Sequence, residues 1–151
     1  MKKKLIMLVF TLIFVFSFSA AAFATDCCDG CCCHYTLTPG FWKNHTDLTE
    51  SLLPIALGNI DVTSIDQAVQ ILNSNGDSSN GINKLCRNLL AVKLNFAYFG
   101  GSLDAADQAD AFLMEYGPDD WSSLTKEQKS YVLGLASALD DYNNSNPPPE
   151  S

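Results

Sequence analysis

Cysteine side chains form the densest group of chemically reactive residues in this chain. Sulfur atoms at such density favour two chemistries, disulfide formation and the binding of a soft metal ion. Which of the two operates depends on the compartment, because oxidising surroundings convert exposed thiols to disulfides. Five of the six cysteines fall within seven residues, a histidine follows them, and the sixth lies far along the chain: Cys27, Cys28, Cys31, Cys32, Cys33, His34 and Cys86.

Disulfide formation is the expected chemistry if the chain is exported. Ring strain disfavours bonds between neighbouring cysteines, so we expect bridges between the first two and the last three members of the cluster. One member can instead bridge to Cys86, which would staple the N-terminal segment to the domain. Closing that loop of about 55 residues would contribute on the order of 4 kcal/mol. The cluster is also placed to crosslink the chain to other copies of itself or to cell-surface proteins.

Metal binding is the alternative chemistry for the same cluster. Cys28 and Cys31 have the spacing of a two-ligand metal knuckle, and Cys33 with His34 would complete a tetrahedral site for Zn or Cu. Cys86 is a further possible ligand. Under the disulfide interpretation we expect no cofactor.

A second group of polar and aromatic side chains lies at Phe41, Trp42, Lys43, Asn44 and His45. We interpret it as a capped first helical turn, in which the rings anchor in the core and the polar side chains satisfy backbone groups. The alternative is a ligand site with Trp42 as a stacking platform and His45 as an acid, base or metal ligand. Neither histidine of the chain lies in a known nucleophile motif, so the sequence predicts no catalytic residue and no enzyme.

The N-terminal residues indicate the compartment. Three lysines at 2–4 precede an apolar run at 5–18, and Ala22-Phe23-Ala24 supplies a site with small residues at its first and third positions. This pattern predicts a signal peptide over 1–24, because the apolar run is shorter than the about 20 residues that a membrane span needs. We therefore expect a secreted, extracellular or cell-surface protein without stable membrane insertion after cleavage.

Charge excludes one class of partner. The chain carries nine basic and 17 acidic residues, a formal net charge of −8. Removal of residues 1–24 takes away three lysines and no acidic residue, which leaves a net charge of about −11. Such a surface repels nucleic acid and anionic membranes.

The remaining sequence predicts an all-α fold in one small domain. We expect a helical bundle of about four main helices around a central apolar helix at 82–99, with short helices near 40–58 and no strand of useful length. Capping residues are expected at Ser64, Ser102 and Thr125. The predicted organisation is a signal peptide (1–24), a cysteine-rich segment (25–35), a helical domain (36–143) and a Pro-rich disordered tail (144–151).

Lys93 lies on the apolar stripe of the predicted central helix, because it is eleven residues after Ile82 and thus about 20° from it. We expect its ammonium group to reach solvent along the helix or to pair with a carboxylate, in a structural role first. Asp104, Asp107 and Asp110 are spread over a third of the next helix, and we expect that face to be solvated.

The order and spacing of motifs over about residues 36–115 resemble a widespread group of secreted bacterial and archaeal domains. T-P-G-F-W-K-N-H at 38–45 resembles the group's signature T-x-G-[YF]-W-K-[NT]-H. LGN at 57–59, QAVQILN at 67–73 and LCRNLLAVKLN at 85–95 resemble its later motifs. The resemblance implies an extracellular domain without an established activity, and it implies that Lys93 and Asn95 meet Trp42, Lys43, Asn44 and His45 in space. The cysteine cluster is not part of the group's pattern.

Overall fold

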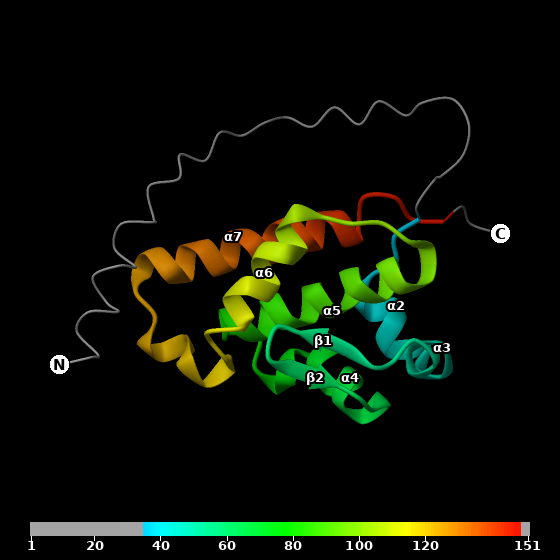
Figure 1. The fold of residues 1–151 in the computed structure, drawn as a ribbon, viewed down its shortest axis with the longest axis horizontal. Coiled ribbons are helices and arrows are strands. Elements are labelled where there is room, and N and C mark those ends of the chain that lie inside the picture. The colour runs from blue at the N-terminus through cyan, green and yellow to red at the C-terminus, as the bar shows by residue number, and fades with distance from the viewer. Residues whose placement is uncertain (1–34, 149–151) are drawn as a thin grey trace. The chain divides into compact units, whose positions relative to one another are not determined.

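The computed structural model describes residues 35–148. The expected signal peptide, the five clustered cysteines and His34 lie outside the described residues, as does the end of the tail. The described part is mostly helical and carries one two-stranded hairpin (Figure 1), which confirms the all-α class. None of the described helices is long and apolar enough to cross a membrane.

Helix α5 (Gly81–Phe99) is the centre of the fold, as the sequence predicts. Twelve of its 19 residues are buried, because neighbours pack on several of its sides. The helix begins where the Asn80 side chain accepts hydrogen bonds from the backbone N–H groups of Ile82 and Asn83. It ends at Gly100, whose φ of 80° lies in the region that favours glycine. Ala97 and Tyr98, near the C-terminal end of the helix, are exposed.

The other elements surround α5, and α7 packs along it most extensively. Capping boxes begin two of them, at Ser64 with Gln67 and at Thr125 with Gln128, as the sequence predicts. Their bounds are α2 Pro39–Asn44, α3 Thr46–Ser51, β1 Ile55–Leu57, β2 Ile60–Val62, α4 Ile65–Leu72, the 3₁₀ helix η1 Ser74–Gly76, α6 Asp104–Leu113, the 3₁₀ helix η2 Pro118–Ser123 and α7 Lys126–Asn143.

The hairpin β1–β2 is an element that the sequence analysis missed. Each strand has only three residues, so the period-two alternation is too short to recognise. Its turn is closed by Gly58 with a φ of 57°, and the turn lies against the C-terminal end of α6. A second difference is the start of α6, where Leu103 and not Ser102 occupies the N-cap and no side chain caps the helix.

The two ends of the described domain are bonded to each other. The Thr36 backbone N–H donates to the Asn146 carbonyl at 2.8 Å, and the Asn146 N–H donates to the Thr36 hydroxyl at 3.1 Å. Figure 1 shows the start and the end of the described chain side by side. The segment 144–146, expected to be disordered, is therefore hydrogen-bonded to the domain, and the domain ends later than residue 143.

Gly58→Ala should destabilise the domain by about 3 kcal/mol. A side chain is strained at this φ, and a Cβ would lie 2.5 Å from the Leu113 backbone carbon. Gly134→Ala is the matched control, because nothing lies within 4 Å of a Cβ on that exposed helical glycine. The control should gain about 0.5–1 kcal/mol from helix propensity. Urea denaturation of both variants measures the difference, and equal stabilities would contradict the role of the turn.

Candidate functional site

Asn95 is the most highly connected polar side chain of the core. It is 1% exposed, and its amide uses every hydrogen-bonding position it has. Its Oδ1 accepts from the Leu37 backbone N–H at 2.9 Å and from the Trp42 indole Nε1 at 3.2 Å. Its Nδ2 donates to the Leu37 carbonyl at 2.9 Å and to Asn143 Oδ1 at 3.0 Å. One side chain thus joins the segment before α2, α2 itself and the end of α7 to the central helix.

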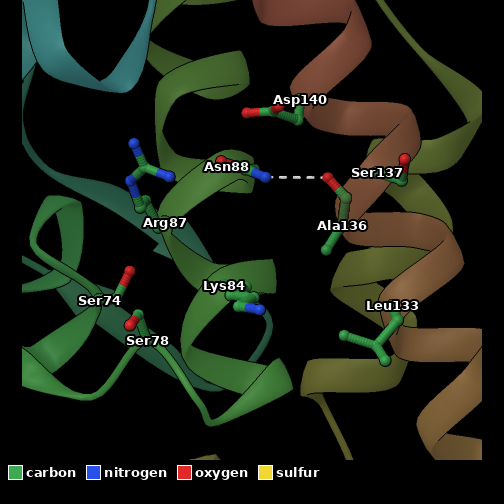
Figure 2. A pocket seen from close by; sticks show the side chains of 9 residues that line it. All are labelled: Ser74, Ser78, Lys84, Arg87, Asn88, Leu133, Ala136, Ser137 and Asp140. Atoms are coloured by element: carbon green, nitrogen blue, oxygen red, sulfur yellow. Dashed lines mark hydrogen bonds between the residues drawn. The ribbon is translucent and has the colours of Figure 1, made fainter.

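A second set of amides continues this network along the interface between α5 and α7. Asn143 is fully buried, and its Nδ2 donates to the Asn88 backbone carbonyl at 3.1 Å. The Asn88 side-chain Nδ2 donates in turn to the Ala136 carbonyl at 2.8 Å (Figure 2). The Asn88 Oδ1 is the one buried side-chain nitrogen or oxygen in residues 35–148 that has no hydrogen-bond partner. An unpaired buried acceptor of this kind costs about 1–3 kcal/mol.

The aromatic-polar motif takes the structure of a capped turn and not of an open ligand site. Trp42 is fully buried, so its ring has no free face on which a ligand could stack. His45 Nδ1 lies 2.8 Å from the Phe41 carbonyl, and the imidazole stacks on the Phe41 ring at 3.8 Å between centroids. Asn44 is exposed and Lys43 is half-buried. The interpretation of Trp42 as a stacking platform is therefore wrong.

Lys93 serves a different part of the fold from Asn95. Its Nζ lies 2.6 Å from Asp110 Oδ2 and donates to the Ala56 carbonyl at 2.6 Å. The Asp110 Oδ1 accepts from the Gly58 backbone N–H at 2.8 Å, so the pair ties α5 and α6 to the hairpin. Both side chains are about a quarter exposed. The expected pairing of Lys93 with a carboxylate is observed, and the expected solvated face at Asp110 is wrong.

The motifs W-K-N-H at 42–45 and K-L-N at 93–95 were expected to meet in space, and they do so only in part. Of the residues expected to come together, Asn95 and Trp42 share a hydrogen bond. Lys93 is bonded to α6 and β1 instead.

Cys86 is a free thiol in the interior of the core. It is fully buried on α5, and burial raises the pKa of its thiol to about 12. The thiol therefore stays protonated at neutral pH, and the thiolate that a metal ion or a disulfide exchange requires does not form there. Within residues 35–148 no group of three histidine, cysteine, aspartate or glutamate side chains is arranged to hold a metal ion.

A pocket of about 310 Å³, lined mostly by residues of polar type, opens between α5 and α7 (Figure 2). Basic side chains line one wall, and a carboxylate and a hydroxyl line the other. Arg87 is fixed in part, because its Nε donates to the Leu72 carbonyl at 3.2 Å. The lining residues are Ser74, Ser78, Lys84, Arg87, Asn88, Leu133, Ala136, Ser137 and Asp140.

The pocket and the partners of the motif residues were missed at the level of sequence. Asn143 ends a helix in a run of polar residues, and Asp110 was assigned to a solvated face. The available signal was composition: a buried helix rich in asparagine, such as α5, needs amide or carbonyl partners elsewhere in the chain.

Comparison with family models, curated proteins and solved structures found no match to this chain.

Asn95→Ala should destabilise the domain by about 4 kcal/mol, because it leaves Leu37, Trp42 and Asn143 with unpaired buried groups. Asn44→Ala is the control, since that asparagine is exposed and should change stability by no more than about 0.5 kcal/mol. Urea denaturation followed by tryptophan fluorescence gives both values. A loss below about 1 kcal/mol for Asn95→Ala would show that the network is not structurally important.

Asp110 makes two interactions that variants can separate, the ion pair with Lys93 and the hydrogen bond that it accepts from the Gly58 backbone. Asp110→Asn removes the charge and retains an acceptor for Gly58, so it should cost about 1 kcal/mol, and less at high salt. Asp110→Ala removes both interactions and should cost about 2–3 kcal/mol. Asp107→Ala, an exposed carboxylate on the same helix, is the control and should cost about 0.5 kcal/mol. Equal losses in the Asn and Ala variants would contradict the bond to Gly58.

Proposed function

We propose that this protein is an exported, non-enzymatic structural or interaction domain that disulfide bonds crosslink at the cell surface or in the extracellular matrix. Residues 1–24 act as its signal peptide. The resemblance of its motifs to secreted bacterial and archaeal domains supports this proposal.

The burial of Cys86 carries the crosslinking part of the proposal. A bridge to Cys86 would require the cysteine-rich segment to enter a core in which this side chain has no exposed surface. If Cys86 remains a core thiol, five cysteines are left to pair with one another, and an odd number cannot pair completely within one chain. In an oxidising compartment at least one sulfur of each chain then pairs with another molecule. A second copy of this chain carries the same unpaired sulfur.

The attachment of the cysteine-rich segment also suits a crosslink. The segment is followed directly by residues that the domain holds firmly. Tyr35 packs edge-on against Phe99 at 6.3 Å between ring centroids, and Leu37 is bonded twice to Asn95. Because the anchored residues begin so soon after the last cysteine, a crosslink there connects rigid domains through a short tether.

The alternative function is an extracytoplasmic metal-binding module for Zn or Cu. Because Cys86 is buried with a raised pKa, such a site would have to use Cys28, Cys31, Cys33 and His34 alone. It would need the thiols to remain reduced, which an oxidising compartment opposes. Crosslinking is therefore the function that we favour.

The test compares the exported protein on gels with and without a reducing agent. We expect the native protein and Cys86→Ala to migrate as crosslinked species that reduction converts to monomer. Cys32→Ser leaves four cysteines besides Cys86, an even number that can pair within one chain, and should be mostly monomeric without reductant. Cys32 lies outside the proposed metal ligands, so a metal module predicts no effect of this variant on metal content.

Three results would contradict the proposal. The first is a native protein that is monomeric under both conditions. The second is a peptide map with a disulfide to Cys86. The third is a purified protein with reduced thiols and one bound Zn or Cu per chain, which would establish the metal-binding module instead.

Thiol labelling should modify Cys86 only after denaturation, because its thiol is buried and protonated in the folded domain.

A further inference from the structure

One end of the domain is built from segments without a charged residue. Three segments form it, 35–42, 94–103 and 142–148, and none of them contains Asp, Glu, Lys or Arg, although these four types make up 17% of the chain. The end of α5 and the two ends of the described chain lie together there (Figure 1). We call this part the uncharged end of the domain.

Hydrogen bonds and ring contacts join the three segments into one surface. The first segment is bonded to the second through Asn95 and to the third through Thr36. The second segment packs on the third where the Phe96 and Tyr142 rings meet edge-on, at 5.7 Å between centroids. These contacts hold the backbone of the surface in place, so a partner would meet a surface that is already formed.

Tyr98 is the exposed aromatic residue of this end. Its side chain is 51% exposed in the last turn of α5, and its ring packs edge-on against Trp42 at 6.1 Å and against Phe99 at 4.8 Å between centroids. Its neighbours Ala97 and Gly100 are exposed as well. Aromatic residues are enriched at protein interfaces, and charged residues are depleted at their centres. The uncharged end therefore has the composition of an interface.

Charge decides which surface of one copy can approach another copy. The whole chain has a net charge of −8, and removal of residues 1–24 makes it about −11. Two copies of such a chain repel each other, and burying like charges against one another is unfavourable. At the uncharged end a second copy can make contact without burying a charge of these three segments.

The position of the cysteines brings this end close to a second copy. Cys33 precedes Tyr35 by two residues, which span at most about 7 Å, and a disulfide adds about 6 Å between Cα atoms. A crosslink between two Cys33 residues keeps the two Tyr35 Cα atoms within about 20 Å, and one between two Cys27 residues keeps them within about 60 Å. Such tethers give effective concentrations in the millimolar range. A contact too weak to join separate chains is then populated.

We propose that the uncharged end docks against the same end of a second copy of this chain. The contact is two-fold symmetric, because one surface meets itself, and the two Tyr98 rings lie near its centre. This inference rests on the crosslinking proposed above, since it names the partner of the unpaired sulfur. It adds a noncovalent contact that a crosslink alone does not require.

Sedimentation equilibrium of the protein without residues 1–24, kept reduced, tests the docking without the crosslink. We expect dimers with a Kd of about 1 mM or below, which matches the effective concentration that the tether supplies. Higher salt should strengthen the dimer, since it screens the repulsion between two acidic domains. A reduced protein that stays monomeric at about 1 mM overturns the docking, even where gels show the crosslink. Reduced dimers of a protein that never crosslinks would retain the docking and overturn the proposed function.

Variants locate the contact. Ala97→Glu should raise the Kd of the dimer at least about tenfold, because it places a carboxylate on each side of the contact. Ala111→Glu is the matched control, since that exposed alanine of α6 lies outside the three segments. Tyr98→Ser should raise the Kd at least about fivefold, and Leu133→Ser, at a similarly exposed apolar residue of α7, is its control. All four side chains are exposed, so these variants should fold. Equal effects within either pair would contradict the docking of this end.

Discussion

The fold depends on the four hydrogen bonds of the Asn95 amide. This side chain is where the segment before α2, α2 itself and the end of α7 meet the central helix. Apolar contacts tolerate small displacements between helices, but a buried amide with every position used does not. A shift of α7 along α5 would leave Asn95 and Asn143 with unpaired groups in the core. The network therefore fixes the register of elements that hydrophobic packing alone leaves less precisely placed.

The central helix distributes its polar residues by its periodicity. Lys93 and Asn95 are two residues apart, so they point to sides of α5 that differ by about 200°. Asn95 therefore faces the segments at the two ends of the domain, and Lys93 faces α6 and the hairpin. The motif K-L-N thus serves two interfaces at once. This geometry explains why Lys93 does not meet Trp42, although the two belong to motifs that the sequence analysis expected to converge.

The parts of this structure that depend on local chemistry could be predicted from the sequence. The central helix, the capping boxes at Ser64 and Thr125, and the all-α class follow from periodicity and from short-range hydrogen bonds. The hairpin could not be predicted because its strands have only three residues each, and the Asp110 pair and the orphan Asn88 Oδ1 could not because they depend on segments far apart in the chain. Cys86 shows the same limit: its spacing suggested a staple, and only the packing around it reveals a core thiol.

The bonds between Thr36 and Asn146 determine how the molecule would carry mechanical load. A pull applied between residues 36 and 146 acts on adjacent points, so these two hydrogen bonds are among the first to be loaded. A domain pulled through both ends would therefore open first at the contact between Thr36 and Asn146. One held only through the cysteine-rich segment would transmit no force across its own body. In a crosslinked layer, such a molecule would be attached at one end only and would not carry tension between its neighbours.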